Sequence, residues 1–123
     1  MKKNVIETIN EKTEELDFSS ARKYIEVNLT EVTDQKHKLS RNARGILEHI
    51  LNQREKGEES LTREEIGEIQ VVNTYARRFD VRALKMFLKG KEKLFLKSET
   101  RGYLNNDAKT LLLSLGVVEK DIS

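Results

Sequence analysis

The absence of proline is the feature that most restricts what this chain can fold into. Proline breaks helix interiors and glycine weakens them, and the chain holds no proline and only six scattered glycines. Charged residues make up 36% of the chain, which supplies polar outer faces for amphipathic helices. We therefore expect an all-α fold with one core, in a single domain spanning residues 1–123.

Six segments place apolar residues at the three- and four-residue spacing of a helix face. They cover about residues 4–16, 18–32, 41–56, 63–78, 81–89 and 106–115. Residue types that commonly cap helices stand before five of them, namely Asp17, Ser40, Thr62, Asp80 and Asn105. Gly57 and Gly116 are expected to end helices in the left-handed conformation, and residues 91–103 to form a short helix or a continuation.

The chain matches itself when it is shifted along its own sequence. A shift of 63 residues aligns the first two segments of each half, and a shift of 65 aligns the third. The polar matches are Asp17 with Asp80, Arg22 with Lys85, Asn42 with Asp107, and Arg44 with Lys109. Two interpretations stay open, a duplication and a chance register. A duplication predicts a compact array of two three-helix units, about 1–57 and 62–118, packed around a shared core.

Residues 16–29 carry small Ala21 between aromatic Phe18 and Tyr24, and end in the pair Asn28 and Leu29. In this pattern the stretch resembles the turn and second helix of a tetratricopeptide repeat, and residues 79–88 resemble it less closely. The resemblance covers about a third of the chain, while the family's closing proline is missing and the spacing of about 64 residues is not that family's. It implies antiparallel helix pairs that present a groove to a peptide or protein.

Catalytic and cofactor-binding motifs are missing from the sequence. The glycines stand singly, so there is no phosphate-binding or dinucleotide-binding loop and no nucleophile elbow. The two histidines, His37 and His49, lack metal-ligand spacing, and the chain has no cysteine for a zinc site or a disulfide. The neighbouring carboxylates Glu64 and Glu65 suit the first turn of a helix. We expect no enzyme activity, no cofactor and no metal.

The start of the chain is basic, but Glu7, Asn10 and Glu11 interrupt the apolar run that an export signal requires. The longest uninterrupted apolar runs elsewhere, such as residues 94–96, fall far short of the ~20 residues that cross a bilayer. These patterns predict a cytoplasmic protein without membrane contact.

Positive charge gathers in the second half of the chain. Residues 77–101 hold nine Lys and Arg against three Asp and Glu. We single out Arg77, Arg78, Arg82, Lys85 and Lys89 as candidates for binding phosphate groups or a partner. Four of them, beginning at Arg78, keep helical spacing and would form one stripe if the turn at Asp80 does not rotate them apart. A solvated helix face without a function is the alternative.

The helices of the second half are apolar on more than one face. Four apolar residues stand beside positions already assigned inward, namely Val71, Met86, Leu96 and Leu113. They are either buried inside the domain or contact a second copy in a homodimer. Together these features predict a non-enzymatic helical module for protein–protein interaction, of the small regulatory kind. The alternative is a nucleic-acid-binding protein that uses the basic cluster at 77–101.

Overall fold

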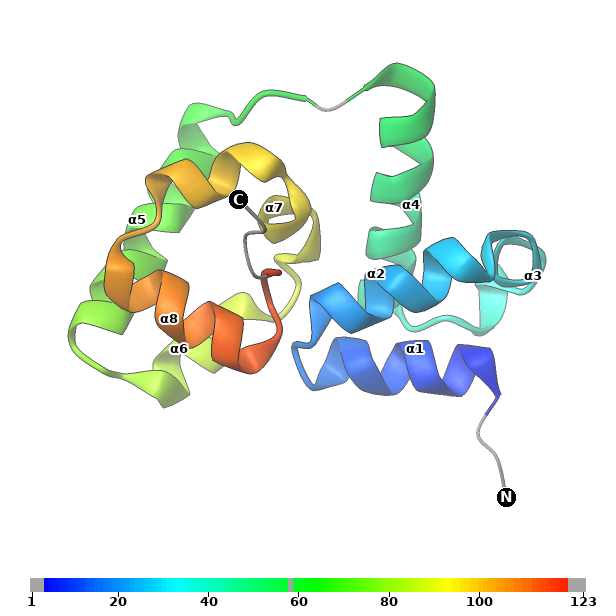
Figure 1. The fold of residues 1–123 in the computed structure, drawn as a ribbon, viewed down its shortest axis with the longest axis horizontal. Helices are drawn as coiled ribbons and strands as arrows, with labels where there is room; N and C mark the ends of the chain where they lie inside the picture. The colour runs from blue at the N-terminus through cyan, green and yellow to red at the C-terminus, as the bar shows by residue number, and fades with distance from the viewer. Residues whose placement is uncertain (1–3, 58, 120–123) are drawn as a thin grey trace.

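The computed structural model describes residues 4–57 and 59–119, and within these ranges the chain is helical with no strand. Across these two ranges, eight α-helices and two short 3-10 helices follow one another. The expected all-α class is confirmed, but the helices are shorter and more numerous than the six predicted. Figure 1 shows α1 to α4 on one side of the molecule and α5 to α8 on the other.

Four α-helices build the first half: α1 (Val5–Glu14), α2 (Phe18–Val27), α3 (Leu29–Asp34) and α4 (Arg41–Lys56). The predicted second helix over 18–32 is therefore wrong in its length, because the chain breaks at Asn28. The side-chain amide of Asn28 donates to the carbonyl oxygen of Tyr24 at 2.9 Å, and such side-chain bonds to nearby backbone compete with a continuing helix. A 3-10 turn, η1 (Lys36–Lys38), occupies the predicted loop before α4.

The second half contains α5 (Arg63–Arg77), α6 (Val81–Leu88), α7 (Glu92–Leu96), η2 (Ser98–Tyr103) and α8 (Asn106–Leu115). The start of α5 is the predicted capping box, in which Thr62 and Glu65 each accept from the other's backbone N–H. Asn105 caps α8 as expected, with a bond of 2.8 Å from Ala108 N–H. Residues 91–103, expected to form a short helix or a continuation, hold both α7 and η2.

The two glycine stops behave differently. Gly116 lies in the left-handed conformation (φ 85°, ψ 7°) and closes α8, as predicted. Gly57 ends α4 with a positive φ of 79° but with ψ at 176°, which lies outside the left-handed helical region and in one that glycine alone adopts readily. The prediction for Gly57 was right about the helix end and wrong about the backbone that makes it.

Each half turns between its first two helices through the same backbone corner. Leu16 and Phe79 both have positive φ, at 68° and 56°. The next residue, Asp17 or Asp80, donates its backbone N–H at 2.9 Å to a carbonyl oxygen of the preceding helix, that of Lys12 or Tyr75. Its side chain caps the following helix. This is the left-handed helix end that glycine normally supplies, built here on two bulky side chains.

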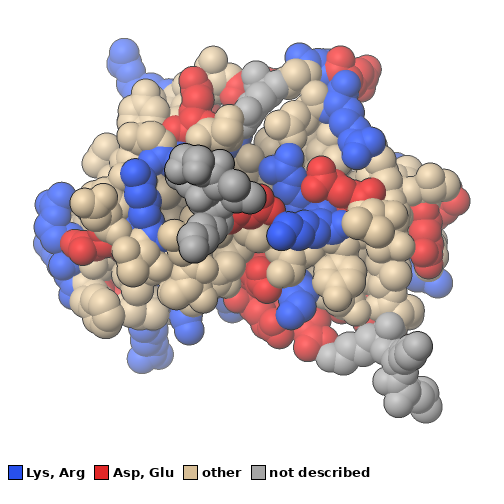
Figure 2. All heavy atoms as spheres, viewed as in Figure 1, with Lys and Arg blue, Asp and Glu red and all other residues tan. Residues whose placement is uncertain are grey.

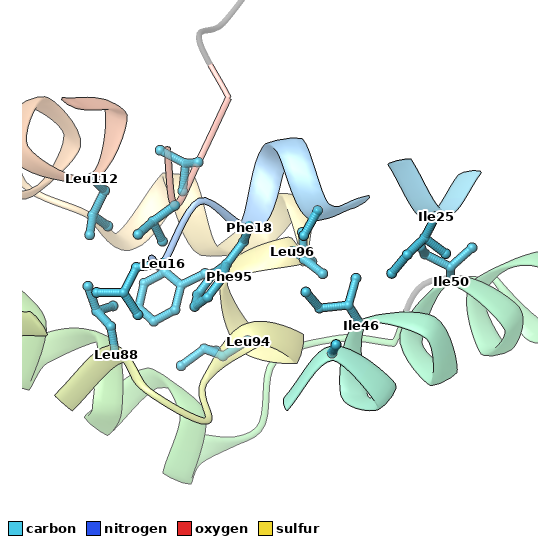
Figure 3. Packing of buried hydrophobic residues seen from close by; sticks show 14 of the residues in the cluster. Leu16, Phe18, Ile25, Ile46, Ile50, Leu88, Leu94, Phe95, Leu96 and Leu112 are labelled. Carbon is cyan, nitrogen blue, oxygen red and sulfur yellow. The ribbon is translucent and has the colours of Figure 1, made fainter. Parts of the chain in front are cut away.

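One hydrophobic core joins the halves. Figure 3 shows Leu16 and Phe18, from the first corner, lying among Leu88, Phe95 and Leu112 of the second half. The helix end at Gly116 lies against the same corner, where its carbonyl oxygen accepts from Ser19 N–H at 3.0 Å. The first corner is thus inserted into the second half of the molecule.

Candidate interaction surface

Four of the nine cations in the basic cluster are engaged by carboxylates from other segments. Lys89 lies 3.7 Å from Glu14, Lys93 3.1 Å from Glu48 and Lys97 3.0 Å from Glu65, while Lys91 pairs with Glu68. Two of these pairs, those of Lys89 and Lys93, cross from the second half to the first. Much of the charge that the sequence concentrates at 77–101 is therefore balanced once the chain is folded.

Four other cations of the cluster stand exposed at the corner between α5 and α6. They are Arg77, Arg78, Arg82 and Lys85. None of them forms an ion pair with another residue that the structure describes. Basic side chains project from this edge of the molecule, at the left and lower left of Figure 2, where α5 gives way to α6. Of the five cations singled out as candidates, Lys89 alone forms an ion pair with a residue in the described ranges.

Two large apolar side chains lie exposed among these cations. Phe79 is 73% exposed and Met86 is 69% exposed. Along α6, Arg82, Lys85 and Met86 follow the spacing that places residues on one outward face, while Leu84 and Leu88 face the core. We call the six residues Arg77, Arg78, Phe79, Arg82, Lys85 and Met86 the cationic corner.

Phe79 is the member of the cationic corner that the sequence did not single out. Its positive φ costs an L-residue roughly 1–2 kcal/mol. Leu16 bears the same cost at the equivalent corner, but Leu16 is only 4% exposed and gains the free energy of burial. Phe79 is mostly exposed, so burial contributes little free energy to offset the cost of its positive φ. The only sequence signal was its match to Leu16 under the 63-residue shift, and that match suggested a core position.

The four predicted dimer residues do not share one environment. Val71, Met86 and Leu113 are exposed on α5, α6 and α8. Leu96 is only 9% exposed, and Figure 3 shows it in the core between the halves, beside Phe95. Of the two alternatives for these residues, Leu96 therefore follows the first: it is buried inside the domain and is not a dimer contact, because α7 turns all three of its apolar residues inward.

A polar hollow of about 520 Å³ lies between α4 and the turn from α6 to α7. Arg44, Glu48 and Lys93 line it, together with Glu92, which is only 3% exposed. Glu92 accepts from Gly90 N–H at 3.0 Å. Burial raises the pKa of Glu92, against the lowering effect of this and its own backbone N–H. The carboxylate is held as a structural cap, and no Ser, Thr, Cys or His is among the described residues that line this hollow.

A second hollow, of about 350 Å³, lies where α4, α5 and the end of α7 approach one another. His49 borders it and is buried on α4. Burial would raise the pKa of Glu65 in the same hollow, but the Thr62 backbone N–H and the Lys97 ammonium lower that pKa overall. Within the described ranges, no three His, Cys, Asp or Glu residues gather closely enough to hold a metal ion.

None of the helices described here combines the length and apolar character needed to cross a bilayer. Comparisons with protein-family models, with curated proteins and with solved structures found no match to this chain.

Proposed function

We propose that this chain is a non-enzymatic, cytoplasmic binding module that docks a partner protein through the cationic corner. The observation that carries the proposal is Phe79, a bulky aromatic residue held at positive φ and left 73% exposed between arginines. Strained backbone and exposed aromatic side chains concentrate at functional sites. Glycine or asparagine at this position would lower the free energy of the folded state, because both adopt positive φ more readily. The fold alone therefore does not explain the phenylalanine, and a binding partner would.

The composition of the corner suits a protein interface. Aromatic residues, methionine and arginine are enriched where proteins contact one another, and an aromatic side chain at the centre of such a patch contributes most of the binding energy. Phe79 would supply that central contact, with Met86 beside it on the outward side of α6. The arginines would surround it and draw in a partner of opposite charge.

Binding to single-stranded nucleic acid is the second candidate, because an exposed aromatic ring among cations also suits base stacking. The ion pairs weigh against it. Lys89, Lys91, Lys93 and Lys97 each pair with a carboxylate, and Arg101 also has an interaction partner. Of the nine cations at 77–101, this leaves the four of the cationic corner for phosphate groups. A short patch of this kind covers few phosphates, and phosphate contacts provide most of the affinity for nucleic acid.

The test is quantitative capture of proteins from lysate of the source cells with the purified chain and with Phe79→Asn. Asparagine tolerates positive φ, so this variant keeps the corner folded while it removes the ring. The matched control is Val27→Asn, which removes an apolar side chain that is 81% exposed at the end of α2. We expect Phe79→Asn to lose at least nine-tenths of a specific captured protein and Val27→Asn to retain it.

Equal capture by all three proteins would refute the proposal. The nucleic-acid candidate is measured in parallel, by fluorescence anisotropy of a labelled 20-nucleotide single strand at about 50 mM salt. Tight binding there that Phe79→Asn weakens would replace the proposed function with the second candidate.

A further inference from the structure

The end of α8 covers the corner between α1 and α2 from outside. The carbonyl oxygen of Gly116 accepts from Ser19 N–H, in the first turn of α2. A Cβ on Gly116 would overlap the carboxylate of Asp17, so only glycine allows this approach. Val117 and Val118, which follow, are buried. The first corner thus receives a glycine-capped helix end.

The corner between α5 and α6 repeats the backbone of the first corner without that cover. Under the 63-residue shift, Phe79 takes the place of Leu16 and Arg82 takes the place of Ser19. Leu16 is 4% exposed and Phe79 is 73% exposed. The Arg82 N–H, unlike that of Ser19, makes no hydrogen bond within residues 4–57 and 59–119. The second corner therefore offers the apolar residue and the donor that the first corner uses.

Charge restricts what fits there. The C-terminal end of a helix carries a partial negative charge, because its last carbonyl groups point outward. Arg77, Arg78, Arg82 and Lys85 are exposed on the residues before Phe79 and on α6 after it, so their positive charge favours such an end. Acidic side chains in the last turn of that helix would strengthen the attraction further.

A second copy of this chain is a poor occupant. The end of its α8 is already used at its own first corner. The end of its α4 carries Arg54 and Lys56, which the cationic corner would repel. The end of its α3 carries the acidic residues Glu31 and Asp34, but it leads directly into the basic turn Lys36–Lys38, which the cationic corner would repel. These three helix ends are therefore poor candidates, and we take the occupant to be another protein.

We propose that the cationic corner receives the C-terminal turn of an α-helix from an acidic partner protein, seated as the end of α8 is seated on the first corner. This inference rests on the proposed function and names the structural element that the partner presents. Phe79 enters the partner as Leu16 enters the second half, and Arg82 N–H donates to a carbonyl oxygen of the partner's last turn.

The probe is a synthetic peptide with the sequence of residues 105–118 and the change Lys109→Glu, which makes it acidic. A staple between positions 106 and 110, both exposed in α8, holds it helical, since a peptide this short is otherwise mostly unfolded. Binding is measured by fluorescence anisotropy and located by amide NMR shifts of the full ¹⁵N-labelled chain. We expect shifts centred on residues 78–86, and at least tenfold weaker binding by the Phe79→Asn chain.

Two control peptides test whether the corner recognises the helix end of the probe or only its negative charge. One is scrambled at the same charge, and the other carries Gly116→Val, which disfavours the left-handed turn. We expect both to bind at least tenfold more weakly. Equal binding of either control, shifts centred on Ser19 instead of Phe79, or no binding of the probe would each overturn the inference. The capture experiment with Phe79→Asn remains the separate test of the proposed function.

Discussion

Asn10 and Asn73 hold equivalent backbone groups in the two halves of the molecule. Asn10 donates to the carbonyl oxygen of Lys38 at 3.2 Å and accepts from Ser40 N–H at 2.8 Å. Asn73 donates to the carbonyl oxygen of Tyr103 and accepts from the N–H of Asn105, both at 2.9 Å. Each asparagine thereby fixes the residue that caps the third long helix of its half. The offsets of these residues are those of the sequence match.

We expect Asn73→Ala to lower the free energy of unfolding by about 2 kcal/mol. Asn73 is buried, so its removal leaves the Asn105 N–H without its acceptor in a place that water reaches poorly. Asn10 is only half-buried, and Asn10→Ala should cost about half as much. Urea denaturation measures both values.

Asn52→Ala is the control for these variants, since Asn52 is exposed on α4, and its stability should change by less than about 0.5 kcal/mol. A larger loss for Asn10→Ala than for Asn73→Ala would contradict the role assigned to burial.

Local signals were enough to predict where most helices begin. Asp17, Ser40, Thr62, Asp80 and Asn105 cap helices as expected, because capping joins residues only three positions apart. The break at Asn28 was missed, since the apolar spacing runs through it and only a bond from its side chain to Tyr24 reveals the interruption. Asn10 and Asn73 were missed too, because their partners lie about 30 residues away.

Because the end of α8 packs closely against the first corner, we expect substitution of Gly116 to reduce stability more than substitution of another glycine with positive φ. Gly116→Ala should lower the free energy of unfolding by about 3 kcal/mol, because the positive φ and the collision with Asp17 add together. Gly90→Ala is the matched control: it has a similar φ of 83°, but its nearest neighbour, Asn42 Oδ1, would lie at an ordinary 4.0 Å. That variant should lose only about 1–2 kcal/mol. Equal losses in thermal or urea unfolding would show that the end of α8 is not tightly seated.

Glu92 predicts a stability difference that depends on pH. Burial raises the pKa of Glu92 above its ordinary value of 4.5, so its charged form destabilises the folded state. The native state then binds this proton more readily than the unfolded state, and the penalty disappears as pH falls through the raised pKa toward 4.5. Glu92→Gln should therefore be more stable than the original chain at pH 7, with a gain that shrinks on acidification.

The measurement for Glu92→Gln is urea unfolding at neutral and mildly acidic pH. The amide oxygen still accepts from Gly90 N–H, so the variant removes the charge and keeps the cap. Glu55→Gln, exposed on the same molecule, serves as control and should change stability by less than about 0.5 kcal/mol. A gain that stays constant with pH would show that the charge of Glu92 is not what destabilises the fold.

The candidate surface was predictable only in part. The sequence located Arg77, Arg78, Arg82 and Lys85 as a basic group, because charge density is a local property. The sequence could not show that four further lysines form ion pairs, because their carboxylate partners in α1, α4 and α5 come near only in the fold. These lysines are Lys89, Lys91, Lys93 and Lys97. The exposure of Phe79 could not be predicted for a similar reason. Leu16 is buried and Phe79 is exposed because different segments pack against the two corners.

The two corners predict opposite stability changes from the same substitution. Phe79→Asn should raise the free energy of unfolding by about 0.5–1 kcal/mol, because asparagine relieves the positive φ and little buried contact is lost. Leu16→Asn relieves the same backbone but places an amide in the core among Leu88 and Leu112, and should cost about 3 kcal/mol. Paired urea denaturation gives both signs. Destabilisation by Phe79→Asn would mean that the ring supports the fold, and the exposed ring would then no longer indicate a role in binding.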